Sequence, residues 1–316
     1  MTATLARATA PPTAPRRRRR PTRRQGVAYL LLAPAVAVLA IGLGYPVWWQ
    51  VTSSFKEFGL AQQFGQPAPW VGLDNYVRIF TSDALWAVVL RSIAFCLFNA
   101  FVTVAIGVGL ALLMRAAGRW ARLALQVAML LAWAMPMVAA VTVFKWLFDW
   151  RTGVVNWLFV RAGVVEMHEH HWLASPLSFF LVASLVIIWM SVPFVALSVY
   201  AGLMQVPEEV REAARIDGAS ATQQFWHVTV PMIRPVLAIV LLLQIIWDLR
   251  VFGQIRLLQD GGAPVGDTNL LGNFIFELGI GRQDFAGAAA VSIFVLALTA
   301  LVSWPYVRAL IKELDR

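Results

Sequence analysis

The sequence predicts an all-α, polytopic membrane protein, and three observations support this fold class. Hydrophobic residues fill 59% of the 316 positions and charged residues only 14%, whereas an average soluble domain carries about 25% charged residues. Several apolar windows of about 20 residues are long enough to cross a bilayer as helices. Arginines gather in alternate connections between these windows. We place six spans at residues 27–50, 88–114, 121–148, 178–203, 235–256 and 287–308.

The arginines also predict the orientation of the spans. They precede the first span, separate the second from the third, follow the fourth and follow the sixth. Because basic residues collect in cytoplasmic connections, we expect both termini and the connection after the fourth span in the cytosol. Residues 1–24, rich in Arg, Pro and Ala, are expected to form a disordered cytoplasmic tail, and residues 25–316 one transmembrane domain. The net charge of +9 needs no nucleic-acid partner, since orientation and anionic lipid account for it.

The first three spans contain few features beyond apolar sequence. The first leads into an outer loop, residues 55–83. The second contains Gly107 and Gly109, small residues that allow close helix packing. The third contains Lys145 and Asp149, which are four residues apart and are expected to neutralise each other across one helical turn.

A histidine-rich stretch, Met-His-Glu-His-His-Trp at residues 167–172, lies in the second outer loop. Three histidines and a glutamate are potential zinc ligands, but their spacing differs from the H-E-x-x-H pattern of a metal-binding helix. We interpret this stretch as a solvated loop that faces an extracytoplasmic partner. Metal binding by His168–His171 is the alternative.

A polar stretch at residues 206–231 follows the fourth span and predicts two short helices. Pro207 suits a first helical turn, and the glutamates that follow it favour the positive end of a helix dipole. The Asp217-Gly218 pair is expected to end the first helix, because glycine readily adopts the positive φ of a C-terminal cap.

The second of these helices is predicted from its cap. Ser220 and Gln223 have the spacing of a capping box, and Pro231 is expected to end the helix. The stretch is too charged for lipid and too ordered for a simple tether, so it is expected to form a structured loop at the cytosolic surface.

This stretch resembles the EAA loop of binding-protein-dependent ABC importer permeases, in the sugar-permease branch related to the maltose and glycerol-phosphate systems. The resemblance is carried by Glu212, Ala213, Ala214, Asp217, Gly218, Ala219, Phe225, Val228, Pro231 and Pro235. It implies that residues 204–234 form coupling helices that sit in a groove of an ATPase subunit. The implied coupling residues are Glu212, Ala213, Ala214, Asp217, Gly218, Ala219, Phe225 and Pro231. An interfacial helix, or a loop folded on its own bundle, is the alternative.

Three further stretches are similar to the same family. Residues 70–76 resemble its "GL-x-NY" stretch, which implies a short amphipathic helix before the second span. Residues 189–203 resemble the W…PF…AGL sequence that leads into the EAA loop. Residues 257–268 resemble the "LT-x-GGP…T" segment of the maltose-type first permease subunit, although Gln259 replaces the threonine and Ala263 interrupts the GGP run.

Asp248, in the fifth span, is the most conspicuous polar residue inside the predicted bundle. An aspartate at a span centre costs about 2.5–3.5 kcal/mol, and Val251 and Phe252, its neighbours one turn on, supply no cation. Asp248 must therefore face the bundle interior, water or a partner subunit. Trp247 adds a flat apolar surface with one N–H donor, and a sugar ring needs this combination. A polar clamp between helices is the alternative.

The family resemblance implies substrate contacts in the fourth and fifth spans. Carried over one by one, they match Met190, Ser191 and Phe194 in the fourth span and Gln244, Trp247 and Asp248 in the fifth. Asp248 stands where the family member has asparagine.

No catalytic machinery is identifiable. The sequence lacks the G-x-x-x-x-G-K-[ST] phosphate-binding pattern, and its lysines are at 56, 145 and 312 only. Shifting a helix bundle almost completely from one conformation to another takes about 5.5 kcal/mol of differential binding. Because this chain has no ATP-binding motif, a partner must supply that energy. We therefore expect a non-catalytic subunit that binds no cofactor, with ATP and Mg used by a partner ATPase.

Together these observations predict the six-helix core of a type I ABC importer permease in a prokaryotic plasma membrane. The resemblance implies four kinds of partner: a second permease chain, two ATP-binding subunits or domains, an extracytoplasmic solute-binding protein and membrane lipid. Residues 257–268 favour the first-permease role and hence a heterodimer. The implied solute is a sugar or oligosaccharide, for example maltose or trehalose. Glycerol 3-phosphate is the competitor, and Asp248 argues against an anionic solute. An ion-coupled secondary transporter is a further alternative, although no inverted repeat is found.

Overall fold

The computed structural model describes residues 23–314. The expected disordered tail therefore lies almost entirely outside the described residues. The chain divides into two units, Met1–Trp49 and Gln50–Arg316. The described part of the first unit belongs to helix α1, Arg23–Ser54, whose last residues enter the second unit. Its apolar segment Leu30–Ser54 is long enough to cross a membrane, as the sequence predicted.

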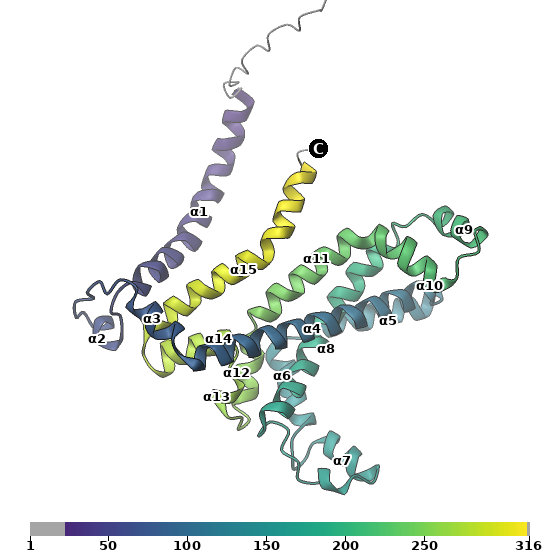
Figure 1. Ribbon diagram of the computed structural model, residues 1–316. Helices are drawn as coiled ribbons and strands as arrows, with labels where there is room; N and C mark the ends of the chain where they lie inside the picture. The colour runs from purple at the N-terminus through teal and green to yellow at the C-terminus, as the bar shows by residue number, and fades with distance from the viewer. Residues whose placement is uncertain (1–22, 315–316) are drawn as a thin grey trace, which may run out of the picture. The chain divides into compact units, whose positions relative to one another are not determined.

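The second unit is built from helices and their connections (Figure 1). Its α-helices after α1 are α2 Leu60–Gln63, α3 Asp74–Phe80, α4 Asp83–Ala116, α5 Arg119–Trp133, α6 Met137–Leu147, α7 Val154–Arg161, α8 Pro176–Leu203, α9 Glu208–Ile216, α10 Ala221–Gln224, α11 Val230–Leu249, α12 Gly253–Gln259, α13 Val265–Thr268, α14 Leu271–Phe276 and α15 Phe285–Leu314. The helical fold class is therefore confirmed. Helix α3 is the short helix expected before the second span.

Five helical segments in residues 23–314 are long and apolar enough to span a membrane, and α5 with α6 makes a sixth if the two form one bent span. The axes of α5 and α6 differ by 97°. Pro136 explains the break, because its ring lacks an N–H and crowds the carbonyl of Ala132 four residues earlier. It also disfavours helical backbone at Met135. The third predicted span, residues 121–148, thus consists of two helices with a sharp break between them.

The second short helix of the polar stretch does not end at Pro231, contrary to expectation. Helix α10 continues through a five-residue π-helical turn, Phe225–Thr229, directly into α11. In this turn the Val230 N–H donates to the Phe225 carbonyl, five residues back. The wider turn relieves the clash that Pro231 would otherwise have with the carbonyl of His227. The loop is thus joined without a break to the fifth span.

Helices α4 and α8 pack side by side over much of their length (Figure 1). Gly107 of α4 lies against Val195 of α8, whereas Gly109 has nothing within 4 Å of where a Cβ would be. The packing role expected for both glycines therefore holds for Gly107 only.

Lys145 and Asp149 do not neutralise each other. Lys145 Nζ donates to the Leu257 carbonyl at 3.2 Å, and the Asp149 carboxylate accepts bonds from Arg151 and Thr152. The reason is that α6 ends at Leu147, so Asp149 no longer lies on the same helical face one turn beyond Lys145.

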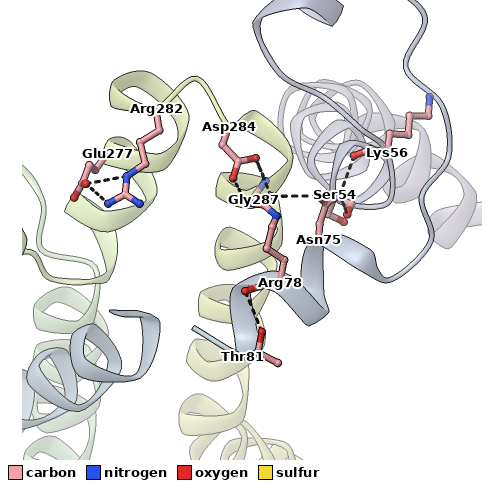
Figure 2. A network of polar contacts seen from close by, with 9 residues as sticks. All are labelled: Ser54, Lys56, Asn75, Arg78, Thr81, Glu277, Arg282, Asp284 and Gly287. Atoms are coloured by element: carbon pink, nitrogen blue, oxygen red, sulfur yellow. Dashed lines mark hydrogen bonds and ion pairs between the residues drawn. The ribbon is translucent and has the colours of Figure 1, made fainter. Parts of the chain in front are cut away.

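A polar network ties α3 to the beginning of α15 (Figure 2). Arg78 donates two hydrogen bonds to the Asp284 carboxylate, at 2.7 and 3.1 Å. Asp284 also accepts the Gly287 N–H at 2.9 Å and so caps α15. Beside it, Asn75 donates to the carbonyls of Ser54 and Lys56. These bonds fix the connections at this end of the second unit.

Candidate functional site

A hollow of about 530 Å³ lies between α8, the C-terminal end of α11 and the start of α12. Four of the six predicted substrate residues line it: Met190 and Ser191 from α8, and Trp247 and Asp248 from α11. They meet there because α8 and α11 pack against each other.

Aromatic rings form one wall of the hollow. Phe194, a fifth predicted residue, packs edge-on against Trp247 with ring centroids 5.1 Å apart. On its other side lies Trp133, at 6.1 Å. Trp133 and Trp247 keep 53% and 45% of their surface exposed. Two broad indole faces are therefore available to a ligand, with Phe194 between them.

The sixth predicted residue, Gln244, does not line the hollow but holds Asp248. Its Nε2 donates to Asp248 Oδ1 at 2.9 Å, one turn along α11. Both side chains are buried, at 0% and 3% exposure. Gln244 Oε1 and Asp248 Oδ2 are buried without a hydrogen-bond partner among residues 23–314. A buried oxygen without a partner costs about 1–3 kcal/mol.

Sequence reasoning missed the other lining residues of the hollow, among them Trp133 and Arg250. Trp133 is the last residue of α5, and the break before Pro136 brings its ring to the hollow. Pro136 could have signalled that break. Arg250 follows the last residue of α11, is exposed, and has no ion-pair partner among the described residues.

The predicted coupling loop has the local structure that its sequence indicated. Helix α9 begins directly after Pro207 and is capped by Asp217, and Gly218 follows with φ +80°. The capping box forms as predicted: the Ser220 N–H donates to Gln223 Oε1 at 2.8 Å, and the Gln223 N–H donates to Ser220 Oγ at 3.3 Å.

The side chains implied for ATPase coupling lie mostly on the surface of this loop. Glu212, Ala213, Asp217, Gly218 and Pro231 are exposed, and the remaining three are half-buried. Neither α9 nor α10 has a buried residue. These residues are therefore accessible to a partner.

The histidine-rich stretch packs on aromatic rings. His171 lies 4.1 Å from Trp150 and His170 lies 4.8 Å from Trp172, measured between ring centroids. Within residues 23–314 there is no group of three His, Cys, Asp or Glu side chains that could hold a metal ion.

The segment at residues 257–268 forms an ordered turn. Gln259, which replaces the family's threonine, donates from Nε2 to Thr268 Oγ1 at 3.1 Å and to Asn269 Oδ1 at 3.0 Å. Gly262 supplies the positive φ of the turn, +99°. The departure at Gln259 is thus compatible with a closed loop.

Comparison with known proteins agrees with this architecture. The family model described as "Binding-protein-dependent transport system inner membrane component" matches residues 103–308. The diacetylchitobiose uptake system permease protein DasB of Streptomyces coelicolor is 37% identical over 90% of this chain and 87% of its own length. The sulfoquinovosyl glycerol transport system permease protein SmoG of Agrobacterium fabrum is 31% identical over 89% of each chain.

A third relative and a solved structure complete the comparison. The trehalose/maltose transport system permease protein MalF of Thermococcus litoralis is 30% identical over 86% of this chain and 90% of its own. A crystal structure of a bacterial ABC transporter that imports the acidic polysaccharide alginate contains a chain with the same fold. Its TM-score is 0.75 at 22% identity, over 90% of this chain and 96% of that one.

Proteins of this family are multi-pass inner membrane components, non-catalytic and without bound cofactors. The family model covers most of the second unit, including α8, the coupling loop and α11. The chain belongs to the binding-protein-dependent transport system inner membrane components and is a permease subunit of an ABC importer.

Proposed function

We propose that this chain forms half of the translocation pathway of an ATP-driven importer for a neutral sugar or oligosaccharide, with a disaccharide as the preferred size. The hollow between α8 and α11 carries this proposal. Its volume of about 530 Å³ falls within the range of roughly 300–1,000 Å³ typical of small-ligand sites.

The chemistry of the hollow suits a pyranose. Apolar C–H faces of sugar rings stack on indole rings such as Trp133 and Trp247. Hydroxyl groups can exchange bonds with Ser191 Oγ, and Asp248 Oδ2, which is buried beside the hollow, can accept one when its side chain turns toward the ligand. The names of DasB and the archaeal MalF, which are uptake permeases for diacetylchitobiose and for trehalose or maltose, support the same substrate class.

An anionic sugar is the second candidate, and Arg250 favours it. Its guanidinium lines the same hollow as Asp248 and lacks an ion-pair partner in the described part of the chain. A planar guanidinium binds carboxylate, sulfonate or phosphate groups well. SmoG, named for sulfoquinovosyl glycerol, is 31% identical to this chain. Glycerol 3-phosphate belongs to this second class.

The proposed partners follow from surfaces that this chain leaves open. A second, related permease would cover the exposed Trp133 and Trp247 and complete the pathway. Two ATP-binding subunits or domains would engage residues 204–234, and an extracytoplasmic binding protein would deliver the solute. Arginine placement supports an orientation with both termini in the cytosol.

The test is uptake by the complete transporter in proteoliposomes, with its ATPase and binding protein. The solutes are maltose, trehalose, diacetylchitobiose, sulfoquinovosyl glycerol and glycerol 3-phosphate. We expect ATP-dependent uptake of a neutral disaccharide and a loss of about tenfold in Trp247→Ala, the order of an aromatic contact. Trp304→Ala is the control, because Trp304 of α15 is also exposed but lies outside the hollow.

Three outcomes would change the proposal. Uptake of only the anionic solutes, lost in Arg250→Ala, would favour the second candidate. Equal effects of the two tryptophan variants would remove the hollow from the pathway. Uptake by this chain alone, driven by a sodium or proton gradient, would favour a secondary transporter instead.

A further inference from the structure

A single carboxylate joins the coupling helix α9 to the end of α4. Glu208, the first residue of α9, is bound at Oε2 by two arginines from different helices. Arg211 lies one turn along α9 at 2.6 Å, and Arg115, in the last turn of α4, lies at 3.6 Å. The two arginine side chains are largely shielded, at 22% and 18% exposure, whereas Glu208 is 54% exposed.

The end of α4 from which Arg115 extends is itself held in place. Arg122 of α5 donates from Nε to the Met114 carbonyl at 3.0 Å and from a terminal nitrogen to the Ala117 carbonyl at 2.9 Å. These bonds satisfy carbonyls that a helix end leaves free. The end of α4 and the start of α5 therefore form one fixed frame. A hollow of about 830 Å³ separates this frame from α9 and α10.

Few other interactions fix the position of α9. It contributes no buried side chain. Within residues 23–314, the Arg115–Glu208 ion pair is the only polar side-chain bond between α9 and a helix long enough to span the membrane. Its covalent connections lead to α8 on one side and, through α10, to α11 on the other. The ion pair is thus a third link, to α4.

Charge makes this link sensitive to geometry. Arg115 and Arg211 repel each other, and Glu208 lies between them as the shared counter-charge. If α9 moves away from α4, Glu208 stays with Arg211 on its own helix and Arg115 loses its partner. Displacement of α9 would therefore break the Arg115–Glu208 ion pair but leave the Arg211–Glu208 ion pair intact. The Arg115–Glu208 pair is the one that opposes such a displacement.

We propose that Arg115 is a positioning residue that couples α4 to α9, so that a push on α9 is transmitted to α4 as well as to α8 and α11. This inference rests on the proposed role of residues 204–234 in ATPase coupling. The transmission path then includes α4, a helix that does not directly precede or follow residues 204–234 in the chain.

The experiment measures ATP hydrolysed per solute transported by the complete reconstituted transporter. Arg115→Ala should raise this ratio about two- to fivefold, the effect expected from a partly shielded ion pair. Arg115→Lys keeps the charge and should stay close to wild type. Arg119→Ala is the matched control, because Arg119 begins α5 four residues further on but stacks on Trp120 and makes no ion pair within residues 23–314.

A charge exchange decides the case if Arg115→Ala fails to assemble. Arg115→Glu alone places two acids together and should uncouple transport. Adding Glu208→Arg restores opposite charges across the link and should recover coupling. A wild-type ratio in Arg115→Ala, or no recovery in the exchanged pair, would overturn the inference. Failure of the proposed function would be distinct, because the wild-type transporter would then show no ATP-driven uptake.

Discussion

Gly107 of α4 lies directly against Val195 of α8. A Cβ added at Gly107 would be 2.4 Å from Val195 Cγ1 and 3.2 Å from the backbone nitrogen of Ala196. Real Cβ atoms do not approach other atoms so closely, so the two helix backbones are in contact only because residue 107 has no side chain. This contact joins α4, which carries Arg115, to α8, which leads into residues 204–234.

Gly107→Ala should therefore destabilise the bundle by about 1–3 kcal/mol, the usual cost of overpacking a close contact. Thermal unfolding of the purified transporter in detergent measures the change. Gly109→Ala is the control, because nothing lies within 4 Å of the Cβ it would add, and it should shift stability by less than about 0.5 kcal/mol. Equal melting temperatures for the two variants would contradict this account of the α4–α8 contact.

Gly218 tests whether the bend of the coupling loop depends on backbone conformation. Its φ is +80°, and no atom lies within 4 Å of a Cβ built there. Strain alone therefore opposes a side chain. Gly218→Val should cost about 1–2 kcal/mol locally and uncouple ATPase activity from uptake while membrane insertion stays intact. Gly218→Asn, which tolerates positive φ, should retain most coupling. Normal uptake by the valine variant would argue against a coupling role for this bend.

Sequence predicted best what depends on neighbouring residues. The ends of α9 at Pro207 and Asp217 and the Ser220–Gln223 capping box follow from side chains within a few positions, and all three are confirmed. The approximate places of the spans follow from apolar length alone. The effects of Pro136 and Pro231 were harder to predict, because a proline can either break a helix or be accommodated by a wider helical turn. Tertiary packing around the proline decides which of the two occurs.

In the candidate hollow, too, features set by neighbouring residues were predicted and features set by tertiary packing were not. Asp248 and Trp247 stand out in the sequence because an acid in an apolar span is costly. Trp133 did not, because it reaches the hollow only through the bend between α5 and α6. Helical spacing predicted an ion pair between Lys145 and Asp149, but α6 ends between them. Lys145 instead donates to the Leu257 carbonyl, more than 100 residues away in sequence.

Asp149 predicts an acid-sensitive loop. The N–H of Thr152 donates to its carboxylate at 2.8 Å, and this bond, with those from the Thr152 hydroxyl and the Arg151 N–H, holds the pKa of Asp149 below its ordinary value. A lowered folded-state pKa means that the carboxylate stabilises the turn at neutral pH and that this stabilisation is lost as pH falls through the lowered pKa.

The change should therefore occur below about pH 4 and leave neutral pH unaffected. Hydrogen exchange of the amides of residues 150–154 measures it: exchange, corrected for its intrinsic pH dependence, should accelerate in acid. Asp149→Asn keeps an acceptor oxygen but cannot be protonated in this range, so its corrected exchange should not change with pH. Acid acceleration of the same size in that variant would assign the effect to another group.

The buried pair Gln244–Asp248 separates a structural role from a transport role. Gln244→Leu removes the donor to Asp248 Oδ1 and leaves both carboxyl oxygens without partners at 3% exposure. It should destabilise the protein by about 1–3 kcal/mol. Asp248→Asn keeps an acceptor for Gln244 and should fold normally. Gln244→Leu combined with Asp248→Leu removes both polar groups and should regain much of the lost stability.

Uptake kinetics of the stable variants then assign the role of Asp248. If it contacts the solute, the double-leucine variant should fold yet lose most uptake, while Asp248→Asn keeps uptake with an altered KM or solute preference. If the pair is only a clamp between helices, uptake should follow stability, and the double variant should transport as well as its melting temperature allows. Unchanged kinetics in Asp248→Ala would remove this carboxyl group from the pathway and leave Trp133 and Trp247 to define the hollow.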